Sequence, residues 1–154
     1  MSYGEQLRGI ANEYYKTHRA PATTKDIAVW AVRNGLWHPQ QSDVIDRCAE
    51  ELSRAMREEH MIDPQGRSVR AKHVARVKDG GGQTRFVWAD IRTAPLRFMQ
   101  VAFQQRRQQI IGDCRQLKTD VDSYNENAKP EKPIQIVFDF TRDLEELEQQ
   151  DSAA

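Results

Sequence analysis

Three amphipathic helix patterns followed directly by two strand patterns constrain the fold of this 154-residue chain more than any other feature. Apolar residues recur at helical spacing in three ranges, 3–16, 24–34 and 43–59. Two alternating segments, 73–78 and 84–89, then flank Asp79-Gly-Gly-Gly82, a composition typical of a hairpin tip. The sequence therefore predicts three helices and an antiparallel hairpin within residues 1–92, an organisation that is mainly α with a small β component.

The expected elements have apolar faces and recognisable ends. Thr23 with Asp26 predicts a capping box for the second helix, and Ser42 predicts the cap of the third. Asp63-Pro-Gln-Gly66 predicts a turn before the first strand. The side chains expected to point inward are Leu7, Ile10, Ala11 and Tyr14 in the first helix, Ile27, Trp30 and Ala31 in the second, and Val74, Val77, Phe86 and Trp88 in the strands.

The second half of the chain predicts a long helix over residues 93–124. Thr93 is its expected cap, with Pro95 in its first turn. A strict seven-residue repeat indicates a seam against another helix, in a second copy or in the chain's own core. The repeat consists of Leu96, Phe103, Ile110, Leu117 and Tyr124. Residues 125–154 then predict a linker, a strand-like apolar segment at Ile134–Phe140 and an acidic helical tail at 142–150.

The charge of the chain is balanced in total but unevenly distributed. There are 23 basic and 23 acidic residues, yet residues 67–92 hold seven basic residues against two acidic ones, a local charge of +5. Residues 139–151 hold six acidic residues against one arginine, a local charge of −5. We therefore expect a basic hairpin and an acidic tail, the latter available to a protein partner.

Cysteine usage and hydropathy predict a cytoplasmic protein. Cys48 and Cys114 are the only two cysteines, and both fall on apolar helical positions, as reduced and packed thiols do. No segment approaches the ~20 apolar residues that a membrane span requires. The first residues also lack the apolar stretch of a secretory signal.

The sequence gives no pattern for catalysis, a metal or a cofactor. The four histidines, His18, His38, His60 and His73, are scattered, and no cysteine pair completes a zinc site. Gly80-Gly-Gly82 precedes a strand and lacks the Lys-Ser/Thr of a phosphate-binding loop. We therefore expect a binding protein that carries no cofactor and is not an enzyme.

The basic hairpin is the strongest candidate for a binding surface. Cations along a hairpin edge can contact a phosphate backbone without reading its sequence. The candidate nucleic-acid-binding residues are Arg70, Lys72, Arg76, Lys78 and Arg85, with Arg54 and Arg57 as contributors from the third helix. The same charges would also suit an ordinary solvated hairpin that resists aggregation. The third predicted helix, residues 43–59, contains three arginines and six acidic residues. The acidic residues near its start would repel phosphate.

Residues 7–89 resemble winged-helix domains, and within them the HARE-HTH group. The resemblance lies in Ala20-Pro-Ala-Thr-Thr-Lys-Asp-Ile27, in a strand over 67–78 and in Thr84-Arg-Phe-Val-Trp88. It implies a winged helix-turn-helix of three helices and a β-hairpin wing, followed here by the long C-terminal helix. It also implies DNA recognition, or a link between chromatin, transcription and restriction machinery.

These observations predict a DNA-binding protein that contacts double-stranded DNA through its basic wing, as a transcriptional regulator or a mobile-element accessory protein. A homodimer through residues 93–124 would suit two half-sites. The alternative is a protein-interaction adaptor on the same scaffold, whose long helix and acidic tail engage a partner. A third hypothesis is a small enzyme whose site a partner completes.

Overall fold

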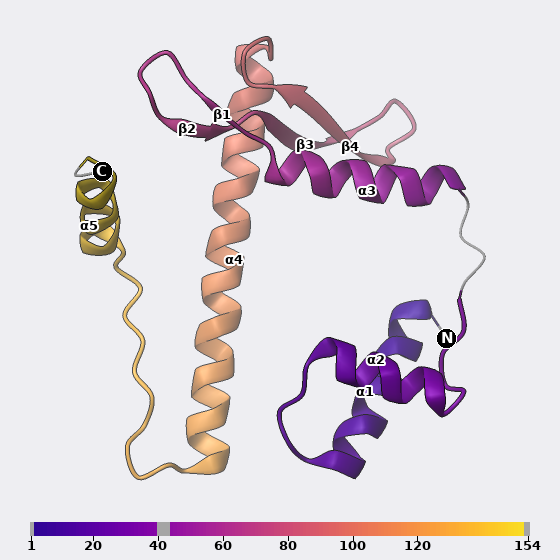
Figure 1. Cartoon of the computed structure of the whole chain (residues 1–154). Helices are drawn as coiled ribbons and strands as arrows, with labels where there is room; N and C mark the ends of the chain where they lie inside the picture. Colours follow the sequence, from indigo (N-terminus) through magenta and orange to yellow (C-terminus); the bar gives the residue numbers. More distant parts are fainter. Residues whose placement is uncertain (1, 40–43, 153–154) are drawn as a thin grey trace. The chain divides into compact units, whose positions relative to one another are not determined.

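The computed structural model describes residues 2–39 and 44–152 (Figure 1). This part of the chain forms two compact units that divide between Glu51 and Leu52. It is mainly helical, with five helices and two antiparallel hairpins, which confirms the predicted α+β composition. Within the described ranges, no helix combines the length and the apolar character that crossing a membrane requires.

The first unit is built on the contact between α1 (Tyr3–His18) and α2 (Thr24–Arg33). Tyr14 and Ala31 are buried. The ring of Tyr14 stacks on His18 with centroids 4.1 Å apart and meets Trp30 edge-on at 5.5 Å. This aromatic cluster therefore joins the two helices.

Helices α1 and α2 each begin with a reciprocal capping box. The backbone N–H of Asp26 donates to the Thr23 hydroxyl at 3.0 Å, and the Thr23 N–H donates to the Asp26 carboxylate at 3.2 Å. Ser2 and Glu5 form the same pair of bonds at the start of α1. The capping box predicted at Thr23 is thus confirmed.

Helix α3 (Val44–Glu58) starts in the first unit and continues into the second. It matches the predicted range of 43–59, although Ser42 and Asp43 lie outside the described residues. Cys48 is an exposed free thiol, so the expectation that it is packed was wrong. The apolar positions of α3 share one face, but no residue of the helix is buried.

Two hairpins follow α3. The first pairs β1 (His60–Ile62) with β2 (Ser68–Arg70), and the second pairs β3 (Lys72–Lys78) with β4 (Thr84–Asp90), both antiparallel. The second hairpin was predicted, whereas the first was not. The strand expected over 67–78 is divided at Ala71, whose backbone N–H donates instead to the carbonyl of Glu59.

The faces of the β3–β4 hairpin differ from the predicted ones. Alternation places Val74 and Val77 on opposite faces, so they could not both point inward. The buried face carries Ala71, His73 and Ala75, while Phe86 is 67% exposed. Large apolar side chains were predicted to point inward, but the small ones are buried because a helix lies close against this face.

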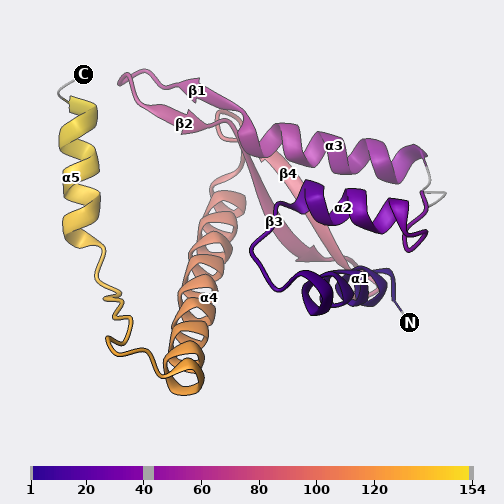
Figure 2. The same ribbon diagram turned by 60° about the horizontal axis from the view of Figure 1, so that its bottom comes forward.

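Helix α4 (Leu96–Ala128) is 33 residues long and continues through Gly112. Figure 2 shows it as one uninterrupted helix. Thr93 is not its cap: Pro95 occupies the cap position without a side-chain bond, and the Thr93 N–H belongs to a turn closed by the carbonyl of Asp90. The helix also extends four residues beyond the predicted end at 124.

After α4 and a turn comes α5 (Thr141–Ser152), the predicted acidic helix. The Asn125 side chain fixes the turn, because its amide nitrogen donates to the Ile134 carbonyl at 2.9 Å and its oxygen accepts from the Ile134 N–H at 3.0 Å. The apolar segment Ile134–Phe140 is not paired as a strand within the described part of the chain.

Replacement of Thr23 tests the capping box. Thr23→Ala removes the side-chain acceptor at the start of α2 and should destabilise the first unit by about 1 kcal/mol. Thr24→Ala, one position later, is the matched control and should change stability much less. Urea unfolding followed by circular dichroism measures both, and equal effects of the two variants would contradict the assigned cap.

Candidate anion-binding groove

The first turns of α4 pack against the buried face of the hairpin. Met99 and Ala102 of α4 are buried, as are Ala71 and Ala75 on the hairpin side. The His73 ring meets Phe103 edge-on, with centroids 5.2 Å apart. Because alanines form the centre of this contact, helix and strand backbones can approach closely, which brings the polar residues of α4 next to β3.

Gln105 joins α4 to the open edge of β3. Its side-chain oxygen accepts from the Arg76 N–H at 2.7 Å, and its amide nitrogen donates to the Arg76 carbonyl at 2.9 Å. The two bonds reproduce those that a neighbouring strand would make to an edge. They hold the backbone of Arg76 in place while its side chain remains exposed.

His73 fixes the backbone at Arg70 in a similar way. Its Nε2 lies 2.9 Å from the Arg70 carbonyl oxygen. A carbonyl only accepts, so the Nε2 of His73 carries the proton and donates. His73 is 7% exposed, and its packing against α4 therefore sets the position of the end of β2.

A groove of about 680 Å³ lies along β3 and α4 within the second unit. Asp113 is the one carboxylate among the residues that line it. Small and aliphatic residues and the ring of His73 form part of the lining. The remaining lining residues are basic, amide-bearing or aromatic: Arg57, Arg70, Lys72, Arg76, Arg106, Gln105, Gln108, Gln109, Phe86 and Trp88.

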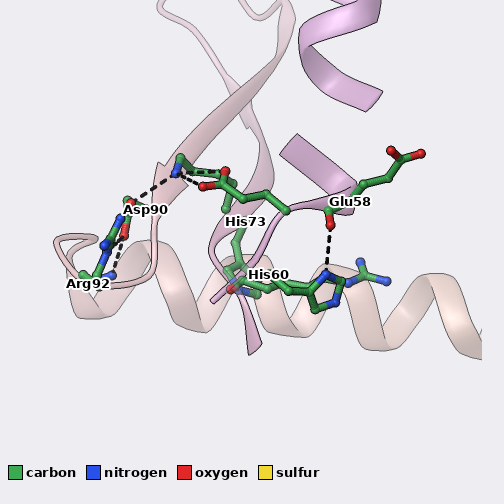
Figure 3. A network of polar contacts seen from close by, with 8 residues as sticks. Glu58, His60, His73, Asp90 and Arg92 are labelled. Atoms are coloured by element: carbon green, nitrogen blue, oxygen red, sulfur yellow. Dashed lines mark hydrogen bonds and ion pairs between the residues drawn. The ribbon is translucent and has the colours of Figure 1, made fainter. Parts of the chain in front are cut away.

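Lys72 is neutralised within the protein. Its ammonium lies 3.1 Å from Glu59 and 3.2 Å from Asp90, and these bonds raise its pKa. Asp90 also holds the Arg92 guanidinium at 2.7 Å, as Figure 3 shows. Hydrogen bonds from Arg92, and then from Lys72, keep the pKa of the Asp90 carboxyl well below its ordinary value. This network joins the ends of β3 and β4 and supplies no free charge.

The arginines of the groove are different. Within the described residues, none of Arg70, Arg76 and Arg106 forms an ion pair with an acid. Burial and then the nearby charge of Arg70 lower the pKa of Arg106, although a guanidinium remains charged at neutral pH. Arg57 lies over the Trp88 ring, 5.6 Å from its centroid. An anion in the groove would relieve this uncompensated positive charge.

The structure brings together four of the seven candidate residues: Arg57, Arg70, Lys72 and Arg76 line the groove. Arg54, Lys78 and Arg85 do not, and Arg85 forms an ion pair with Asp79 at 3.2 Å. The candidate site is therefore a groove between hairpin and helix, and not the whole outer edge of the wing.

Arg106 and the three glutamines were not among the predicted site residues, because they belong to a polar run, Gln104 to Gln109, within the predicted long helix. Helical spacing contained a usable signal. Arg106 follows Met99 by seven residues, so both lie on the face that packs on the hairpin. The sequence did not indicate that this face of the helix packs against β3.

Other chemistry is not apparent in the described part of the chain. No group of three or more His, Cys, Asp or Glu side chains there is arranged to hold a metal ion. His60 directs its Nδ1 to the Glu58 carbonyl at 2.9 Å, also drawn in Figure 3, and so serves the local backbone.

Gln105→Ala tests the contact that shapes the groove. The variant loses both bonds to the Arg76 backbone and should destabilise the second unit by about 1–2 kcal/mol, the net value of two exposed hydrogen bonds. Gln104→Ala, its neighbour outside the groove, is the control. Chemical unfolding measures the difference, and a Gln105→Ala variant as stable as Gln104→Ala would contradict the predicted contact.

Asp90→Asn tests the ion-pair network through pH. The depressed pKa of Asp90 contributes stability that is present above the unfolded pKa of 3.8 and is lost as pH falls through the lower folded value. The variant should therefore have a lower Tm than the wild type at neutral pH, with a difference that shrinks below pH 3.8. Glu126→Gln on exposed α4 should show no such pattern. A pH-independent difference for Asp90→Asn would contradict the assignment.

Comparisons with known proteins do not identify a function for the groove. No protein-family model matches this chain, and neither a curated protein nor a solved structure is significantly similar to it. The winged-helix assignment accordingly remains a hypothesis from sequence pattern and element order.

Proposed function

We propose that this chain binds double-stranded DNA by placing phosphates in the basic groove between β3 and α4. The observation that carries the proposal is that Arg70, Arg76 and Arg106, from three different elements, line one groove without an acidic partner among the described residues. Guanidinium groups suit phosphate because their planar donors match its oxygens. Phosphate contacts of this kind provide affinity and orientation but not sequence discrimination.

The glutamines of α4 strengthen the proposal. Gln108 and Gln109 line the groove beside Arg106, and no hydrogen bond occupies either side chain within the described residues. Their amides can donate to phosphate oxygens. Backbone contact with DNA combines cations with neutral donors of this type.

The acidic start of α3 no longer conflicts with DNA binding under this proposal. Arg57, in the last turn of the helix, lines the groove, whereas Asp46 and Glu50 near its start do not. Within α3, phosphate in the groove would therefore meet Arg57 and not the acidic start of the helix. This arrangement differs from the usual helix-turn-helix, in which the start of the third helix approaches the bases.

We propose a winged-helix fold, with β3 and β4 as the wing, from the sequence resemblance and the order of the elements. The element order supports it, because α1, α2 and α3 precede the β3–β4 hairpin, with the short β1–β2 hairpin between them. A role in transcription or beside a mobile element is the finer form of the proposal, and it requires the DNA contact described above.

A protein-interaction adaptor is the second candidate. It is favoured by apolar side chains that remain exposed near the C-terminal end. Val137 is 78% exposed, and Leu144 and Leu147 of α5 are more than half exposed, beside the acidic residues of the tail. An amphipathic acidic segment of this kind can dock in a partner's groove.

A titration with labelled random duplex DNA across salt concentrations tests the leading proposal. Arg76→Gln/Arg106→Gln should weaken binding and reduce the slope of log K against log salt by ~0.9 for each lost phosphate contact. The matched control is Arg54→Gln/Arg115→Gln, which removes the same charge from positions outside the groove.

Equal losses in the two double variants would show that net charge, and not the groove, governs binding. No binding at low salt by the wild-type chain would overturn the proposal and favour the adaptor. Fluorescence anisotropy, measured over the same range of protein concentrations at each salt concentration, gives both the affinity and its dependence on salt.

A further inference from the structure

The distal half of α4 carries an apolar seam whose d residues remain about half exposed in the described part of the chain. The contact with β3 involves the first turns of α4, where Met99 and Ala102 are buried. Further along, Ile110 is 52% exposed, Leu117 45% and Tyr124 53%. Such a stripe on a helix is costly in water, so it requires a cover.

The spacing of the seam residues indicates that another helix covers them. Ile110, Leu117 and Tyr124 fall at d positions of a heptad, with Arg107, Cys114 and Val121 at the preceding a positions. Gly112 falls at f, on the outer side, where it does not interrupt the contact. A 3.5-residue average repeat remains aligned only with another helix that supercoils around the first.

We infer that the seam is covered by the same helix of a second copy, in a parallel homodimer. The residues beside the seam decide the orientation. In a parallel pair, a g residue meets the e residue of the partner's next heptad, which brings Asp113 to Lys118 of the other copy on both sides. In an antiparallel pair, g meets g, which would place Asp113 against Asp120 twice, and like charges there are unfavourable.

Two local features are compatible with the parallel pair. Lys118 already binds Asp122 of its own helix at 2.7 Å, so it would stand between two carboxylates as a bridging cation. Val121 at a and Leu117 at d are the combination that favours two-stranded coiled coils. Arg107 at a is the polar exception, and a polar residue at a single a position restricts register and number of strands.

The dimer does not depend on what the groove binds. Where the groove binds DNA, as proposed above, a parallel pair would place two grooves at the same end of the coiled coil. One duplex could then meet both, and the second contact would be made at a high effective concentration.

Sedimentation equilibrium of the full chain without DNA tests the inference. The wild-type protein should have twice the mass of one chain. Leu117→Lys/Val121→Lys should be monomeric, because it places charges in the seam. Thr119→Lys/Ser123→Lys adds the same charge on the outer face and should remain dimeric. Circular dichroism at equal concentration verifies that each variant is folded.

A disulfide probe tests the orientation. In Cys48→Ser/Cys114→Ser/Tyr124→Cys, a parallel pair brings the two new thiols together. An antiparallel pair with Tyr124 beside Arg107 would separate them by ~26 Å along the helix. Diamide oxidises the two thiols to a disulfide and takes up their two electrons and two protons. We expect a cross-linked dimer on a non-reducing gel.

A wild-type monomer, or a dimer unaffected by Leu117→Lys/Val121→Lys, would overturn the inferred interface. A dimer that gives no cross-link at position 124 would overturn the parallel arrangement. Neither result depends on DNA binding, so failure of this inference is distinguishable from failure of the proposed function.

Discussion

The contact of Ala71 and Ala75 with the first turns of α4 positions the groove of the second unit. Ala71 and Ala75 leave room for Met99 and Ala102, and Gln105 then bonds the edge of the strand at Arg76. Without this close approach, Arg106 would not lie beside the arginines of β2 and β3. The groove is thus a consequence of backbone proximity, and larger side chains at the alanine positions would open it.

Electrostatics separates two groups of cations that look alike in sequence. Lys72 and Arg92 converge on Asp90, and their charges are used to hold the hairpin ends together. Arg70, Arg76 and Arg106 have no such partner in the described ranges, and burial, followed by the nearby charge of Arg70, lowers the pKa of Arg106. An anion binds more favourably where the protein has left positive charge uncompensated. The local charge of +5 over residues 67–92 therefore overstates what is free to bind.

Local rules predicted the elements well and their packing poorly. The capping box at Thr23, the hairpin tip at Asp79–Gly82 and the long helix follow from signals within a few residues of each other, and all three were predicted. The β1–β2 hairpin was missed because its strands are only three residues long. The buried face of β3 was misassigned because burial there depends on a helix more than twenty residues away. Arg106 was missed for the same reason, and Lys72 could not be recognised as paired before Glu59 and Asp90 were placed.

The most direct measurement of the central claim is nuclear magnetic resonance of the arginine Nε–Hε groups during titration with a short DNA duplex. These signals report each guanidinium separately. We expect the signals of Arg70, Arg76 and Arg106 to shift together and to saturate at the same DNA concentration, while those of Arg54 and Arg115 remain unchanged. Shifts spread evenly over all five arginines, or confined to Arg54 and Arg115, would contradict a phosphate site in the groove.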